Sequence, residues 1–379
     1  MRGHIYRRGS TWTIVHDETT PGGTRKQRSR GGFKTEKEAQ RELTKALATL
    51  DAGTYVKPTV QTVGDYLREW LAAVELQLRP STFTSYKSLV ERQIVPRIGS
   101  VPLQKLTAPQ LNAMYAAMLK KGRLTGKGGA LSPRTVRYCH TVIRKALRDA
   151  VGWGLLGRNV ADSAQPPKKS TTSKPTWSTE QLRAFLDGVA DDRLFAAYLL
   201  LATTGLRRGE VLGLKWSDLD GSKLAIRRSL VNVENVPTFS EPKTSKGRRV
   251  VALDPTTVRA LRSHEERQLL DRVTLGDAWG NRDDLIFVDE VGNPIHPATF
   301  SQAFARHVAR LKLPKLSLHG LRHTHATLAL RAGVHPKVVS ERLGHASVAF
   351  TLDVYTDALP DLQETAALLV ADLVLGNSR

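Results

Sequence analysis

The chain has 379 residues and a formal net charge of +21 at pH 7. At ~100–200 residues per domain this length predicts two or three domains, and the charge favours a polyanionic partner, either nucleic acid or an anionic membrane surface. No apolar run reaches the roughly 18 residues of a membrane span, the basic N-terminus lacks the apolar core of a signal peptide, and the single cysteine, Cys139, excludes an internal disulfide. We therefore expect a cytoplasmic protein.

Residues 1–55 are predicted to form a small module of three short strands and one helix. Turn residues near Pro21 separate the second strand from the third, and Thr35 with Glu38 forms a capping-box pattern at the start of a helix over 34–50. Within residues 1–50, eleven Lys and Arg against five acids leave an excess of +6. The third strand carries a candidate basic sheet face for a DNA groove, with a solvated surface strand as the alternative. Its arginines are Arg25, Arg28 and Arg30.

Residues 62–162 are predicted to form a helical domain of four helices. The first follows a 3.6-residue apolar period, Ser81 opens the second, and Thr107 with Gln110 makes a capping box for the third. Ser132 before Pro133 opens the fourth, whose apolar stripe includes Cys139 as a core residue. Basic residues on the helix faces and in the following linker, 163–175, are candidate phosphate contacts, although alone they are more often typical of solvated faces. These candidates are Lys120, Lys121, Arg134, Arg137, Arg144, Lys168 and Lys169.

Residues 176–379 are predicted to form a mixed α/β domain. Ser178 with Gln181 caps its first helix, and the next, over 192–203, is apolar nearly all round. Strands are expected over 224–233 and 248–253, on either side of a turn, with another over 285–288. Further helices are expected over 256–273, 298–311, 320–332, 336–343 and 362–375. The predicted fold class is thus mainly α multidomain (α+β), and no G-x-x-x-x-G-K loop indicates ATP use.

Four short motifs in this last domain carry the chemistry. Arg207 follows Thr-Gly-Leu, His319 and Arg322 form H-x-L-R, His345 follows Leu-Gly, and Tyr355 comes ten residues later. His319 and Arg322 share a helix face, where donors converge as a phosphate requires. His319 and His323 also match half of a zinc-protease helix, but the required Glu is Gly320 and no cysteine lies nearby, so no metal is predicted.

This ordered set closely resembles the tyrosine recombinases, in particular the phage integrases. The resemblance implies a lysine in a hairpin turn between Arg207 and His319, which is Lys243, with Lys246 as a rival. It also identifies residues 1–55 as similar to an arm-site DNA-binding domain, 62–162 to a core-binding domain and 176–379 to the catalytic domain with a tail helix. The catalytic and core-binding domains then lie on opposite sides of the DNA. Asp357 stands where many relatives have His.

The resemblance implies a site-specific recombinase that integrates or excises a phage or mobile element. Tyr355 attacks a DNA phosphodiester and stays attached to the 3′ phosphate, Arg207, Arg322 and His345 hold the non-bridging oxygens, and His319 accepts or orients a proton. Lys243 protonates the departing 5′ oxygen. The implied partners are double-stranded DNA at core-type and arm-type sites, three further protomers in a homotetramer, a DNA-bending host factor and an excision factor, near the nucleoid of a bacterial host cell. No cofactor is implied.

Structural alternatives remain open for these residues. Arg207 could pair with Glu210 in a core, Arg208 is an adjacent competitor, His345 could cap a helix, and Tyr355 could be a bonded core tyrosine. Two other functions also fit: a nicking and resealing topoisomerase with a similar site, and a basic, non-enzymatic DNA-binding protein.

Overall fold

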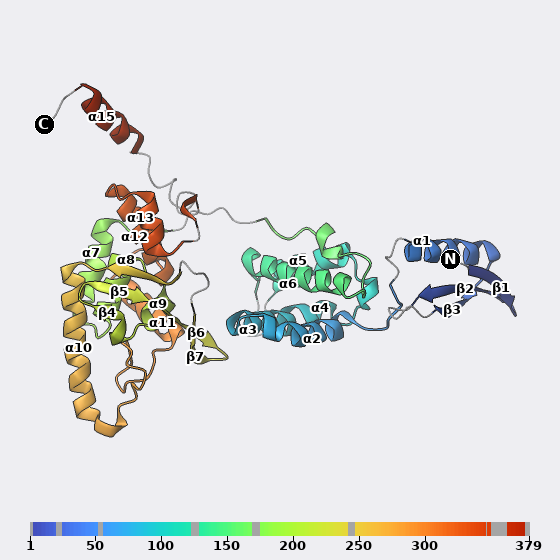
Figure 1. Ribbon diagram of the computed structural model, residues 1–379, viewed down its shortest axis with the longest axis horizontal. Coiled ribbons are helices and arrows are strands. Elements are labelled where there is room, and N and C mark those ends of the chain that lie inside the picture. Colours follow the sequence, from blue (N-terminus) through green and yellow to red (C-terminus); the bar gives the residue numbers. More distant parts are fainter. Residues whose placement is uncertain are drawn as a thin grey trace. The chain divides into compact units, whose positions relative to one another are not determined.

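The computed structural model describes residues 3–19, 25–51, 56–122, 129–168, 175–241, 247–345, 347–349 and 362–375. The chain divides into two compact units, Met1–Thr171 and Thr172–Arg379 (Figure 1). None of the described helices is long and apolar enough to cross a membrane.

The first unit begins with an antiparallel sheet in the order β1-β2-β3 and a helix packed on it. Ile14, Phe33, Ala39 and Leu43 form the small core between sheet and helix. The Thr35 hydroxyl accepts from the Glu38 amide at 3.2 Å, as the capping pattern predicts. The elements are β1 (Gly3–Arg8), β2 (Thr11–Thr19), β3 (Arg25–Phe33) and α1 (Glu36–Asp51).

Of the three arginines proposed for a basic face on β3, Arg28 and Arg30 have described side chains. Arg28 lies opposite His16, Arg30 opposite Ile14, and the register stays regular to Arg25. Arg28 and Arg30 lie two positions apart, and successive strand residues point to opposite faces. Those two share the face that α1 covers, because Ile14 is buried there; Arg30 Nη1 accordingly lies 3.8 Å from a Glu42 carboxylate oxygen on α1.

The rest of the first unit is helical and surrounds its own core. Trp70, Tyr115, Met118 and Cys139 are among its buried side chains, which confirms Cys139 as a core residue. The helical segments are α2 (Val63–Val74), η1 (Glu75–Gln77), α3 (Pro80–Leu89), the π-helical η2 (Val90–Ile94), α4 (Val95–Ile98), η3 (Leu103–Lys105), α5 (Ala108–Lys121), α6 (Pro133–Gly152) and η4 (Val160–Ser163).

Local capping signals located these helices well. The Thr107–Gln110 capping box is present on α5, and Ser132 caps α6 with Pro133 in its first turn. The second helix does not open at Ser81: it begins at Pro80 with Arg79 as N-cap, because proline fits the first helical position.

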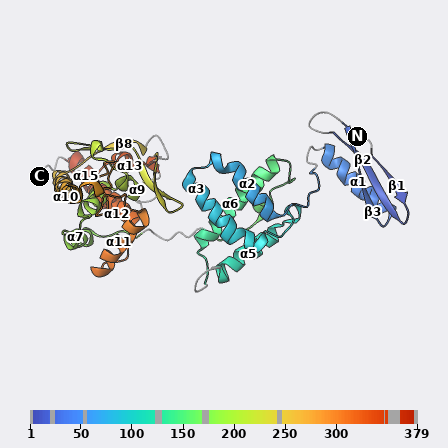
Figure 2. The same ribbon diagram turned by 90° about the horizontal axis from the view of Figure 1, so that it is seen from below.

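The second unit places helices around a short antiparallel sheet ordered β4-β5-β8, with β6 and β7 pairing separately. Figure 2 shows the same elements from a second direction. They are α7 (Thr179–Gly188), α8 (Phe195–Thr204), α9 (Arg208–Leu212), η5 (Trp216–Asp218), β4 (Leu219–Asp220), β5 (Lys223–Ile226), β6 (Ser229–Val233), β7 (Val236–Ser240), β8 (Arg249–Ala252), α10 (Pro255–Leu275), η7 (Gly276–Ala278), α11 (Pro297–Arg310), α12 (Leu318–Arg331), α13 (Pro336–Leu343) and α15 (Leu362–Leu375).

Two strand predictions in this unit need correction. The single strand expected over 224–233 is two strands, β5 and β6, which belong to different sheets. The segment 285–288 is buried but makes only isolated bridges, from Leu285 to Lys215 and from Val288 to Pro294. The predicted helices, the Ser178–Gln181 capping box and the strand near 248–253 are confirmed.

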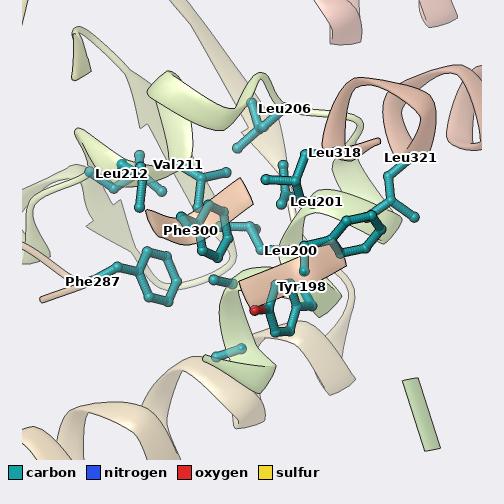
Figure 3. Close-up of a cluster of buried hydrophobic side chains, with 14 of the residues drawn as sticks. Tyr198, Leu200, Leu201, Leu206, Val211, Leu212, Phe287, Phe300, Leu318 and Leu321 are labelled. Carbon is teal, nitrogen blue, oxygen red and sulfur yellow. The ribbon is translucent and has the colours of Figure 1, made fainter. Parts of the chain in front are cut away.

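Helix α8 is the centre of the apolar core of this unit (Figure 3). Leu200 and Leu201 are fully buried, and Tyr198 stacks on Phe300 with ring centroids 5.4 Å apart. This confirms the prediction of a central helix that is apolar on nearly all sides. After α8 the chain continues through Gly205 and Leu206 to Arg207.

Candidate functional site

The loop between α8 and α9 presents Arg207. Gly205 ends α8 in the left-handed conformation, at φ 65°, and a Cβ there would come within 2.5 Å of a Leu343 side-chain carbon. Only glycine fits both demands without strain. Side chains from other elements hold the carbonyls at this helix end: His325 bonds Ala202 O, Arg342 bonds Thr203 O and Arg322 bonds Gly205 O.

Helix α12 carries the H-x-L-R pair. Ser317 caps the helix by accepting from the Gly320 amide at 3.1 Å. Arg322 is 2% exposed and donates to Gly205 O at 2.9 Å and Leu343 O at 2.7 Å. His319, one turn earlier, is exposed, and its ring meets that of His323 at 4.7 Å between centroids. Helix α12 thus carries a solvent-accessible imidazole one turn before a buried guanidinium.

The C-terminal end of α13 carries His345. Gly344 ends the helix in the left-handed conformation, at φ 65°, and His345 follows it, 7% exposed. Arg207 Nη2 donates to Gly344 O at 3.2 Å, so the loop before α9 meets this helix end. The structure therefore brings Arg207, Arg322 and His345 together, although 138 positions separate the first from the last (345 − 207).

A buried carboxylate balances part of the positive charge of this site. Glu210 accepts from Arg207 Nη1 at 2.7 Å, which is the pair anticipated for a structural Arg207, and also from Arg249 Nη2 at 3.0 Å. Arg207 nevertheless remains 43% exposed in its side chain. Burial raises the pKa of Glu210, but Arg249 and Arg207 together hold it below its ordinary value. Arg322 adds a third guanidinium to this site, and the surplus of positive charge favours an anion.

Arg249 on β8 is the site residue that sequence reasoning missed. It is 8% exposed in its side chain and also donates from Nε to Arg342 O at 2.7 Å. The sequence held one signal, an arginine directly before the apolar run Val250–Leu253 of a predicted strand. Its neighbour Arg248 is exposed and pairs with Glu241 at 2.8 Å, and no local pattern separates the two. Arg208, the competitor of Arg207, donates to Ser301 at 2.6 Å.

Burial makes His345 a neutral donor. Desolvation, followed by the charges of Arg322, Arg207 and Arg249, lowers the pKa of His345 to about 4. Its ring is therefore uncharged near neutral pH and offers one N–H. Lys243, Lys246 and Tyr355 lie outside the described residues. Among the described residues, no group of three or more His, Cys, Asp or Glu is placed to hold a metal ion.

Several predicted DNA contacts are exposed on the first unit. Arg137 instead donates to Pro167 O at 2.6 Å, and Arg144 pairs with Asp162 at 2.6 Å. Lys169 lies outside the described residues, as does the side chain of Arg25, and Arg28 is half-buried. The exposed candidates are Arg30, Lys120, Lys121, Arg134, Arg144 and Lys168.

Three buried histidines predict acid sensitivity of folding. Burial is the largest cause that lowers the pKa of His264, His325 and His345 to about 4 each, against about 6.5 in an unfolded chain. Between these values the unfolded state binds more protons, so stability falls as pH falls. The melting temperature of the second unit should therefore drop from about pH 7 to about pH 5. His264→Gln, which removes one titrating ring, should flatten the drop; a constant melting temperature would contradict the assignment.

Three protein-family models match separate parts of the chain. The model of the Phage integrase family matches residues 178–361, that of the Arm DNA-binding domain 4–50, and that of the Phage integrase N-terminal SAM-like domain 62–119. The chain belongs to the phage integrase family of tyrosine recombinases. The residues matched by the model of the Phage integrase family include Arg207, His319, Arg322, His345 and Tyr355.

Curated relatives and solved structures agree with this family. A "Tyrosine recombinase XerC-like" protein of Caldanaerobacter subterraneus is 27% identical over 90% of this chain and 91% of its own length. The integrase of Mycobacterium phage L5 is 28% identical, over 76% and 72%. The fold resembles the Tn1549 transposon integrase solved with circular intermediate DNA (TM-score 0.64, 22% identity, 78% and 95% covered). It also resembles a lambda integrase dimer bound to a COC′ core site (TM-score 0.59, 18%, 94% and 95%). These matches do not support the two alternative functions, a nicking and resealing topoisomerase and a non-enzymatic DNA-binding protein.

Proposed function

We propose that this protein is a site-specific DNA recombinase that cuts and rejoins DNA through a covalent 3′-phosphotyrosine bond, and so integrates or excises a phage or mobile element. The observation that carries the proposal is the meeting of Arg207, Arg322 and His345 at one helix end with surplus positive charge. Capture of the protein on a suicide DNA substrate tests it.

Tyr355 is the nucleophile in this proposal. The second unit contains two tyrosines, Tyr198 and Tyr355. Tyr198 is fully buried in the apolar core, and burial raises the pKa of its hydroxyl above the ordinary value (Figure 3). A buried phenol with a raised pKa cannot reach a DNA phosphate or ionise readily, so Tyr355 is the remaining candidate of its type in this unit.

The proposed reaction exchanges one ester bond for another. The Tyr355 oxygen forms a bond to phosphorus while the bond from phosphorus to the 5′ oxygen breaks. Arg207 and Arg322 stabilise the charge on the non-bridging oxygens, and the neutral His345 ring donates one hydrogen bond to them. His319, which is exposed on α12, takes the tyrosine proton. The phosphotyrosine retains the bond energy, and the reverse attack by a 5′ hydroxyl rejoins the strand.

Lys243 is proposed to give its proton to the departing 5′ oxygen. In the sequence, Lys243 lies between the end of β7 at Ser240 and the start of β8 at Arg249. Lys246 lies in the same segment and remains the rival.

A sulfur leaving group should separate the two lysines. Lys243→Ala should cleave an ordinary substrate slowly but recover on a bridging 5′-phosphorothiolate, since a thiolate departs with little need of a proton. Single-turnover cleavage rates on both substrates measure the recovery, with Lys246→Ala as the matched control. Recovery by Lys246→Ala alone would transfer the role to Lys246.

The proposed assembly follows the family. Four protomers act on two core-type sites of double-stranded DNA, and residues 1–55 bind separate arm-type sites, aided by a DNA-bending host factor and an excision factor. The match of residues 4–50 to the Arm DNA-binding domain supports the second contact. Two tethered sites raise the effective concentration of one when the other is bound.

A further inference from the structure

Three successive backbone carbonyls at the end of α13 each accept a hydrogen bond from a different arginine. Arg342 O accepts from Arg249 at 2.7 Å, Leu343 O from Arg322 at 2.7 Å, and Gly344 O from Arg207 at 3.2 Å. The donors come from β8, α12 and the residue before α9. The next residue along the chain is His345. The proposed function assigns Arg207 and Arg322 to the phosphate and gives no role to Arg249.

Arg249 also shares the carboxylate of Glu210 with Arg207. Its Nη1 lies 3.2 Å from Oε1 and its Nη2 lies 3.0 Å from Oε2, so the guanidinium binds both oxygens. Arg207 reaches the same carboxylate through Nη1 at 2.7 Å and its backbone amide at 2.9 Å. The side chains of Arg249 and Glu210 are 8% and 5% exposed, so little water screens this pair and geometry decides its effect.

We propose that Arg249 is a positioning residue for DNA strand cleavage: it neutralises Glu210, so that Arg207 keeps its charge for the phosphate, and fixes the α13 end that carries His345. Without Arg249, the guanidinium of Arg207 alone would pair with the buried Glu210 carboxylate, and that pair carries no net charge. With it, the two arginines and Glu210 carry +1, and Arg322 raises the sum to +2. This inference rests on the proposed recombinase function.

The orientation of the donors explains why the residue is an arginine. One guanidinium fork covers the two oxygens of Glu210, and its Nε remains for the Arg342 carbonyl. A lysine at this position has the charge but lacks a planar fork and cannot make all three contacts at once.

The test measures single-turnover cleavage at saturating core-site DNA, with DNA affinity measured separately. Arg249→Met should reduce the cleavage rate by about 100-fold, as a misplaced reacting group does, with little change in affinity. Arg249→Lys should fall between Arg249→Met and wild type. Arg262→Met is the charge-matched control, because Arg262 is exposed on α10 and pairs with Glu265 at 2.8 Å, and it should cleave normally.

The decisive comparison adds Glu210→Gln to Arg249→Met. The double variant has no unbalanced carboxylate near Arg207, so it should cleave faster than Arg249→Met alone. A residue that only stabilises the fold would give a double variant as slow as, or slower than, the single one, and that result would overturn the proposal. If Arg249→Met does not fold, a wild-type cleavage rate for Arg249→Lys would overturn it equally. Absence of cleavage by the wild-type protein would instead count against the recombinase function itself.

Discussion

Tyr355→Phe should bind core-site DNA normally and form no covalent product with it. The substitution removes one hydroxyl and no charge, and most affinity for DNA comes from phosphate contacts. Gel-shift affinity and denaturing-gel detection of the protein–DNA adduct measure the two properties separately. Complete loss is expected because no other group replaces the attacking oxygen.

Tyr198→Phe is the matched control for this experiment. It removes the same atom from the other tyrosine of the second unit, whose hydroxyl is buried and, in the described part of the chain, has no hydrogen-bond partner. Stability and adduct formation should both be close to wild type. An adduct formed by Tyr355→Phe and lost in Tyr198→Phe would reverse the assignment.

Arg322→Ala should slow cleavage by roughly 10²–10³, the usual loss for one transition-state donor, and should also lower the melting temperature. Arg322 is 2% exposed and bonds two carbonyls from separate segments, Gly205 O and Leu343 O, which lose their donors together. Arg322→Lys should not restore the rate, because a point charge cannot bind both carbonyls and a phosphate.

Arg207→Ala separates catalysis from folding. Its cleavage defect should be of the same order, but its melting temperature should change less, because Arg207 is 43% exposed and Glu210 stays paired with Arg249. Thermal melts and single-turnover rates for the two alanine variants provide the comparison. Equal losses of stability, with cleavage near wild type, would show that both arginines are structural.

Local signals in the sequence predicted most of the helices. Capping depends on residues within one turn, so Thr107, Ser132 and Ser178 located their helix starts correctly. The four described catalytic candidates were also found from short motifs, because glycine must occupy the left-handed positions before Arg207 and His345.

Contacts between distant residues could not be predicted in this way. The split of the 224–233 segment follows from Asp218, whose buried carboxylate pairs with both Arg227 and Arg228, between β5 and β6. The role of Arg249 depends on Glu210, 39 positions earlier, and on Arg342, 93 positions later. A period of two predicts which strand residues share a face, but not which face α1 packs against. The sequence therefore could not show that Arg28 and Arg30 are on the face of Ile14.

The most direct measurement is capture on a nicked suicide substrate, followed by mass spectrometry of the DNA-linked peptide. The proposed chemistry predicts one linkage, from Tyr355 to a 3′ phosphate, with a free 5′ hydroxyl on the released strand and no requirement for ATP. A linkage at another residue, attachment to a 5′ phosphate, or tight binding without any linkage would contradict it.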